Sequence, residues 1–181
     1  MTTCIYVDGV IASDSRVTSG TDINPVYFKK TYKVEGKFAD EELVGAAIAG
    51  NAMRKKLFLE WLAKGAPLLE YIPRFQDGLQ ALILTKTGIW LYSNGEMIEG
   101  WDGISIGSGG SKATAFFNVN KNQKNIVNAT DCIKSAICPT SGDSASGGMI
   151  QWISRDSNGT TAMPSTVLPE HSEQYESVLP K

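Results

Sequence analysis

The order of strand-like and helix-like segments is the feature that most restricts how this sequence can fold. Runs rich in β-branched and aromatic residues fall into groups, with turn residues between neighbouring runs. Segments with helical periodicity lie between and after these groups, at residues 51–65, 111–119 and 128–138. Strands grouped in this way favour an α+β fold over a parallel sheet in which every strand is followed by a helix.

Two local signals set the expected element boundaries. Residues 2–7 and 10–13 flank Asp8-Gly9, a dipeptide that readily adopts the positive φ of a tight turn, and this predicts an N-terminal β-hairpin. Further along, a buried strand is expected to end at Gly50. Asn51 is a good N-cap, so we expect a helix to begin directly after that glycine.

Length and composition indicate one globular domain. A chain of 181 residues with 42% hydrophobic and 20% charged residues can bury a sizeable core. We assign residues 2–163 to this domain. Residues 164–181 are polar and proline-containing, so they are expected to form a loosely ordered tail.

Charge, cysteine content and hydropathy exclude several classes of function. With 17 Lys and Arg against 19 Asp and Glu, the chain has no general attraction to nucleic acid. Its three cysteines and its one histidine, His171, lack metal-ligand spacing, so neither a metal nor a cofactor is expected. No apolar run reaches the ~18 residues of a membrane span, and no signal peptide is recognisable. We therefore expect a cytoplasmic protein without a membrane partner.

The residue after the initiator methionine offers a chemistry that needs no histidine. Thr2 is small enough for Met1 to be removed, which would place a hydroxyl and a free α-amine on one residue. An α-amine has an ordinary pKa of about 7.7 to 8.0, so near neutral pH part of it can accept the hydroxyl proton. His171 lies in the polar tail and is a weak candidate for a Ser-His-Asp triad.

Several short motifs occur in an order that points to one enzyme family. They are Thr2-Thr3-Cys4-Ile5, Val10-Ile11-Ala12-Ser13-Asp14-Ser15-Arg16, Lys29-Lys30, Ile48-Ala49-Gly50, Gly107-Ser108-Gly109 and Asp143-Ser144-Ala145-Ser146-Gly147-Gly148-Met149-Ile150. Across roughly residues 2–155 the sequence resembles proteasome β-subunits and their bacterial HslV-type relatives, which are threonine peptidases.

The resemblance implies a fold and an activity. The fold is a four-layer α/β/β/α sandwich of the N-terminal-nucleophile hydrolase type, with two antiparallel sheets covered by helices. The activity is that of a threonine-type endopeptidase that cleaves unfolded polypeptides inside a homo-oligomeric ring. A separate ATP-dependent unfoldase would supply the substrate, since this chain has no Walker-type glycine loop.

The resemblance also assigns catalytic roles. Thr2 matches the nucleophile, Lys30 the buried lysine beside it, and Asp14 the aspartate that offsets the cost of burying that lysine. A nearby ammonium would disfavour protonation of the α-amine and so keep it basic. Adjacent strand residues face opposite sides, so only one of Lys29 and Lys30 can point inward. The motif alignment favours Lys30, and Lys29 is the alternative.

Four further residues match groups around the threonine. Ser108, Asp143 and Ser146 match side chains that form hydrogen bonds near the threonine amine, although each also suits an ordinary turn. Gly50 matches the glycine whose backbone N–H binds the oxyanion. A helix N-terminus at that position would favour developing negative charge, but a packing glycine would look the same in sequence.

Apolar and aromatic residues match the family's substrate pocket and predict cleavage after apolar residues. These positions are Val17, Phe28, Tyr32, Ile48 and Ala52. Each of them is also compatible with a plain core position. The adjacent Arg54-Lys55-Lys56 run is interpreted as a solvated helix face.

The sequence departs from the family pattern in two places, and two other functions stay open. The stretch between Thr2 and Asp14 is shorter than usual. Shortening both strands of the hairpin can accommodate this, and Thr2 and Asp14 then keep their relative orientation on the sheet. The helical region after Gly50 is also short, so the ring size is left open. The alternatives are a small-molecule amidohydrolase of the same fold and a catalytically inactive ring subunit.

Overall fold

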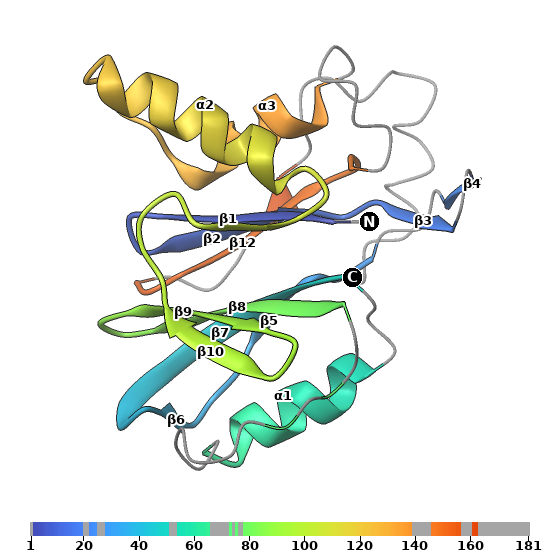
Figure 1. Ribbon diagram of the computed structural model, residues 1–181, viewed down its shortest axis with the longest axis vertical. Coiled ribbons are helices and arrows are strands. Elements are labelled where there is room, and N and C mark those ends of the chain that lie inside the picture. Colours follow the sequence, from blue (N-terminus) through green and yellow to red (C-terminus); the bar gives the residue numbers. More distant parts are fainter. Residues whose placement is uncertain are drawn as a thin grey trace.

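Two antiparallel β-sheets face each other in the molecule (Figure 1). The computed structural model describes residues 2–19, 22–24, 28–50, 54–65, 73, 75, 78–138, 146–156 and 161–162. The first sheet contains β1 (Thr3–Val7), β2 (Val10–Asp14), β11 (Ser105–Gly107), β12 (Ile150–Ser154) and β13 (Thr161–Ala162). The second contains β5 (Thr31–Lys33), β6 (Lys37–Phe38), β7 (Glu41–Gly50), β8 (Leu79–Thr85), β9 (Ile89–Ser93) and β10 (Glu96–Glu99).

The strand order places both strands of the N-terminal hairpin, β1 and β2, inside the first sheet. That sheet has the order β11-β1-β2-β12-β13, and the second has the order β10-β9-β8-β7-β5 with β6 beside β7. All of these pairings are antiparallel. A separate hairpin is formed by β3 (Val17–Ser19) and β4 (Asp22–Asn24).

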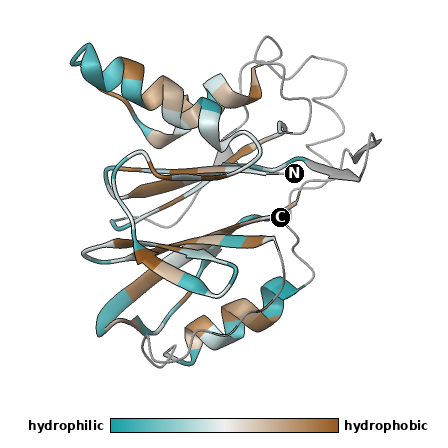
Figure 2. Cartoon of the chain, viewed as in Figure 1, coloured by the Kyte–Doolittle hydropathy of each residue, from teal (hydrophilic) through white to brown (hydrophobic). Residues whose placement is uncertain are grey.

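Helices lie on the outer faces of the two sheets. The described part of the chain contains α1 (Lys55–Ala63), α2 (Gly110–Asn122) and α3 (Ala129–Ile137). In Figure 1, α2 and α3 lie over the first sheet and α1 lies over the second. Hydrophobic residues (brown in Figure 2) occur on the strands and on the helices that cover them. No helix within the described segments is long and apolar enough to cross a membrane.

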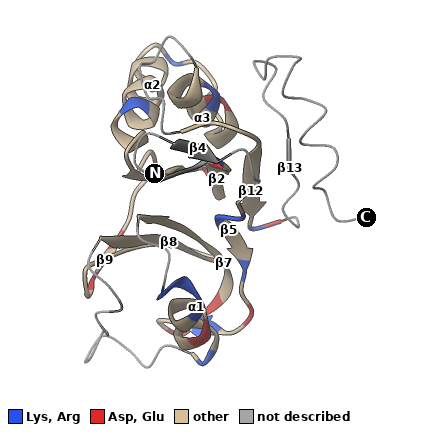
Figure 3. Cartoon of the chain, turned by 90° about the vertical axis from the view of Figure 1, so that its right-hand side faces the viewer, with Lys and Arg blue, Asp and Glu red and all other residues tan. Residues whose placement is uncertain are grey.

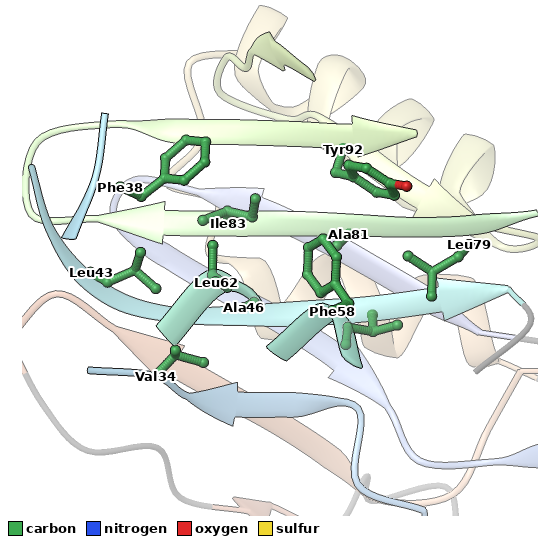
Figure 4. Close-up of a cluster of buried hydrophobic side chains, with 11 residues drawn as sticks. Val34, Phe38, Leu43, Ala46, Phe58, Leu62, Leu79, Ala81, Ile83 and Tyr92 are labelled. Carbon is green, nitrogen blue, oxygen red and sulfur yellow. The ribbon is translucent and has the colours of Figure 1, made fainter. Parts of the chain in front are cut away.

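The buried side chains form three hydrophobic clusters that follow these layers. One cluster joins α2 and α3 to the first sheet, one fills the space between the sheets, and one joins α1 to the second sheet. Figure 4 shows the third cluster, in which Phe58 and Leu62 of α1 lie over Ala81 and Ile83 of β8. Burying a large side chain such as Phe58 contributes about 1.5–3 kcal/mol, so these contacts hold each helix on its sheet.

Most of the expected elements are present, with one shifted helix start. The N-terminal hairpin is confirmed, with Asp8 and Gly9 at φ angles of 44° and 79°. The helix expected directly after Gly50 begins only at Lys55, and Asn51 lies outside the described residues. Residues 163–181 are also outside them, so the loosely ordered tail stays a prediction.

Candidate active site

A buried ion pair lies where the end of β2 approaches the start of β5. Asp14 is the last residue of β2 and is 0% exposed, while Lys30 directly precedes β5 and is 2% exposed. Lys30 Nζ lies 2.8 Å from Asp14 Oδ1 and also donates to the carbonyl oxygen of Arg16 at 2.5 Å. Removing two charges from water costs several kcal/mol per ion, so a pair this deep requires good partners.

The Asp14 carboxylate also binds two backbone N–H groups. Thr3 N–H donates to Oδ1 at 2.8 Å, and Gly147 N–H donates to Oδ2 at 2.9 Å. One carboxylate therefore connects the N-terminal strand, Lys30 and the segment that leads into β12. Charge-assisted bonds of this kind are stronger than neutral ones, so Asp14 fixes these three segments relative to one another.

The first described residue, Thr2, is held beside a glycine in β11. Thr2 is 6% exposed, and its neighbour Thr3 pairs with Gly107 in the β1–β11 register. Gly107 has a φ of +86°, and a Cβ built on it would lie 1.8 Å from the Thr2 carbonyl oxygen. Only glycine permits this approach of the two backbones. The Gly107-Ser108 turn, in which Ser108 is exposed, therefore begins beside Thr2.

The segment that begins at Ser146 is hydrogen-bonded to the residues that follow β2. Backbone N–H groups of Ser15 and Arg16 donate to Gly147 O at 3.1 and 2.9 Å, and Met149 N–H donates to the Ser15 hydroxyl at 2.8 Å. Gly147 has a φ of +157°, a backbone conformation that favours glycine. Ser15 is a contributor to which the motifs assigned no role.

The structure brings together some of the predicted site residues and leaves others undescribed. Asp14 and Lys30 bind each other directly, and Thr2 is connected to them through the next residue, because Thr3 N–H binds Asp14. The Ser146 hydroxyl lies 2.6 Å from Thr3 Oγ1, so its described partner is the residue after Thr2. Other predicted positions are not described: Asp143, Ala52 and the side chain of Val17.

Gly50, the expected oxyanion residue, lies at a strand end. It has a φ of +81°, pairs with Leu79 of β8, and a Cβ built on it would lie 1.8 Å from the carbonyl oxygen of Gly78. The described α-helix α1 starts at Lys55, and residues 51–53, where a helix was expected to begin, lie outside the described residues. The dipole of α1 therefore acts mainly beyond residue 50, since the effect is confined to the first turn.

The crowding at Gly50 leads to a prediction with a matched control. Gly78 has a similar φ of +77°, but a Cβ there meets no atom within 4 Å. Gly78→Ala is therefore expected to lower the free energy of unfolding by about 1–2 kcal/mol, the cost of a left-handed alanine. Gly50→Ala is expected to lower it clearly further, because the backbone must move. Chemical denaturation of both variants measures this, and equal losses would contradict the described geometry.

The aromatic residues expected to line a substrate pocket surround a lysine. Lys55 Nζ lies 4.0 Å from the Phe28 ring centroid and donates to the Tyr32 hydroxyl at 3.2 Å, while that hydroxyl donates to Lys29 O. Lys55 is half-buried and burial lowers its pKa, whereas Arg54 and Lys56 are exposed as expected for a solvated helix face. Ile48 packs in the α1-side core, which favours the core interpretation of that residue.

A groove lies beside this aromatic cluster. It has a volume of about 790 Å³ and runs between β5 and α1, with Tyr32, Val34, Lys55 and Leu59 in its lining. Figure 3 shows basic residues in blue on α1 and around β5, the two elements that border it. The groove therefore combines apolar residues with charges of both signs, since Glu35 and Glu60 line it together with the lysines.

The buried cysteines are unsuited to nucleophilic chemistry. Burial raises the pKa of the Cys4 thiol, and it raises that of Cys132 to about 12. The thiolate is the reactive form of cysteine, so neither residue supplies it near neutral pH. Within the described residues, no group of three or more His, Cys, Asp or Glu side chains could hold a metal ion.

Comparison with solved structures identifies proteins of the same fold. Two structures of Thiobacillus denitrificans BPH each superpose with a TM-score of 0.56 at 16% sequence identity, covering 91% of this chain and 98% of theirs. One of them is a complex with epoxomicin. No family model matches the sequence, and no curated protein matches it. The likeness thus lies in the fold, with antiparallel sheets and helices arranged similarly over nearly the whole of both chains.

Proposed function

We propose that this protein is a proteasome-like threonine hydrolase that cleaves peptide bonds with Thr2 as its N-terminal nucleophile. One observation carries the proposal: the buried Asp14 carboxylate binds both the Lys30 ammonium and the backbone N–H of Thr3. The buried ammonium is therefore connected, through Asp14, to the residue next to Thr2. The fold shared with a protein crystallised with epoxomicin, a peptide epoxyketone, supports the same chemistry.

The proposed reaction uses the two functional groups of a free N-terminal threonine. After Met1 is removed, Thr2 Oγ attacks the peptide carbonyl carbon and the Thr2 α-amine accepts the hydroxyl proton. The tetrahedral intermediate expels the leaving amine, which takes that proton, and an acyl ester on Thr2 remains. Water activated by the same amine then hydrolyses the ester. The Lys30 ammonium keeps the amine unprotonated, and the backbone N–H of Gly50 is assigned to the oxyanion.

The remaining roles and the assembly belong to the same proposal. Ser108, Asp143 and Ser146 are assigned to the hydrogen-bond network around the threonine, and Phe28 and Tyr32 to the substrate side. The arrangement of two sheets between helices is assigned to the N-terminal-nucleophile hydrolase type. We further assign to the protein an unfolded polypeptide substrate, a homo-oligomeric ring in the cytoplasm and a separate ATP-dependent unfoldase.

Intact-mass spectrometry before and after treatment with epoxomicin tests this function. The epoxyketone requires both the hydroxyl and the free amine of an N-terminal threonine. The protein is released from a fusion whose cleavage leaves Thr2 as the first residue. We expect one inhibitor per chain, located at Thr2 by peptide mapping. A folded chain that begins at Thr2 and forms no adduct would contradict the proposal and favour an inactive relative.

A further inference from the structure

The short segment that carries Lys30 lies at an open sheet edge. Residues 28–30 adopt no strand, and β5 begins at Thr31 as the last strand of its sheet. On the inner side, Lys30 O accepts a hydrogen bond from Ile48 N at 2.9 Å. Within the described part of the chain, no strand pairs with the outer edge of β5. The described acceptor of the N–H groups of Lys30 and Thr31 is a side chain and not a neighbouring strand, and unpaired buried N–H groups would be costly.

The side chain of Gln151 supplies that partner from the opposite sheet. Gln151 Oε1 accepts from the backbone N–H of Lys30 at 2.9 Å, and from the N–H and hydroxyl of Thr31 at 3.3 and 3.2 Å. Its Nε2 donates to the carbonyl oxygen of Phe28 at 2.6 Å. Gln151 is 2% exposed. A primary amide is suited to this position because it both donates and accepts.

The backbone of Gln151 is registered against the strand that ends in Asp14. In the β2–β12 pairing, Gln151 lies opposite Ser13 and the preceding Ile150 lies opposite Asp14. The strand pair that fixes the carboxylate therefore also fixes the amide that binds the Lys30 backbone. The β2–β12 strand pair therefore positions both members of the ion pair: it carries Asp14 itself, and it carries the Gln151 amide that binds the Lys30 backbone.

We infer that Gln151 is a positioning residue that holds the Lys30 backbone so that its ammonium meets Asp14 beside Thr2. The kinetic part of this inference rests on the proposed function. Loss of the amide leaves the N–H groups of Lys30 and Thr31 without their described acceptor, so the segment shifts and the ammonium moves with it. Small displacements in a catalytic site cost up to about 100-fold in rate.

Gln151→Leu tests the inference, with Ile153→Ala as its matched control. Ile153 lies on the same face of β12 and packs between the sheets, so its truncation is destabilising but removes no hydrogen bond to the backbone of residues 28–31. We expect Gln151→Leu to slow Thr2 acylation by epoxomicin about 10- to 100-fold. We also expect the acidic limb of its pH–rate profile to move to higher pH, because the amine loses a nearby cation. Ile153→Ala should retain the wild-type profile.

Amide hydrogen exchange gives a readout that does not need activity. Gln151→Leu should lose protection at the backbone amides of Lys30 and Thr31, whereas Ile153→Ala should retain it. Unchanged protection at both amides would overturn the inference, as would a rate and pH profile equal to those of Ile153→Ala. If Gln151→Leu does not fold, Gln151→Met, which keeps a side chain of similar length but has no amide, is measured against the same criteria.

These outcomes separate the inference from the function on which it rests. If wild-type protein forms no epoxomicin adduct, the proposed function fails, and the exchange experiment still decides whether Gln151 holds the segment. If wild-type protein reacts and Gln151→Leu matches the control in rate, pH profile and exchange, only the role of Gln151 fails.

Discussion

Thr2→Ala is expected to abolish hydrolysis and epoxomicin acylation without unfolding the protein. The substitution removes the hydroxyl that attacks the carbonyl, and loss of a catalytic nucleophile lowers turnover by about 10³-fold or more. The fold should survive because the bonds that anchor this end use the backbone of Thr3, which donates to Asp14 and pairs with Gly107. Peptide hydrolysis rates and far-UV circular dichroism of the same preparation measure both effects.

Thr2→Ser is the matched control for this prediction. It retains a hydroxyl and an α-amine on the first residue, so it should still acylate, with a rate altered only by the missing methyl group. A variant with one additional residue before Thr2 that cannot be removed should be as inactive as Thr2→Ala, because its amine is part of a peptide bond. A folded Thr2→Ala protein with wild-type turnover would end the mechanism.

The parts of the site that sequence could indicate are those fixed by local chemistry or by motif. Asp8-Gly9 predicts its own hairpin because the turn conformation depends only on those residues. The choice of Lys30 over Lys29 followed from motif order, and the structure shows Lys30 buried against Asp14. The motif match also predicts a substrate pocket lined by apolar and aromatic residues, but Lys55 lies against Phe28 and Tyr32, which sequence periodicity does not reveal.

The parts that sequence could not indicate depend on contacts between distant residues. Gln151 binds Lys30 across 121 positions of chain, and Ser146 binds Thr3 across 143. A glutamine in a strand carries no local sign that its amide will satisfy the backbone of another sheet. Likewise, the need for glycine at position 107 arises only because Thr2 O approaches it in the folded chain. Only the tertiary register could reveal these residues.

The Asp14–Lys30 ion pair gives the second large expected effect, and it concerns stability as well as catalysis. Lys30→Met leaves the Asp14 carboxylate buried with two backbone donors among the described residues, those of Thr3 and Gly147. Asp14→Asn removes the negative charge beside the buried ammonium and replaces one acceptor oxygen by an NH2 group, which cannot accept from the donors that Asp14 binds. Removing one partner of a buried pair costs about 3–5 kcal/mol. Each single variant should therefore lose about that much free energy of unfolding and also lose acylation at Thr2.

The double variant Asp14→Asn/Lys30→Met distinguishes an interacting pair from two independently important residues. Once both charges are absent, neither variant strands a buried ion, so the combined loss of stability should be smaller than the sum of the single losses. Coupling energies for contacting residues are about 0.5–3 kcal/mol, which is large enough for urea denaturation to resolve. Acylation should stay abolished in the double variant even where stability recovers, because the ammonium that keeps the Thr2 amine unprotonated is missing. Strictly additive losses would show that the two side chains do not act as a pair, and recovery of acylation would show that the charge is not needed for the chemistry.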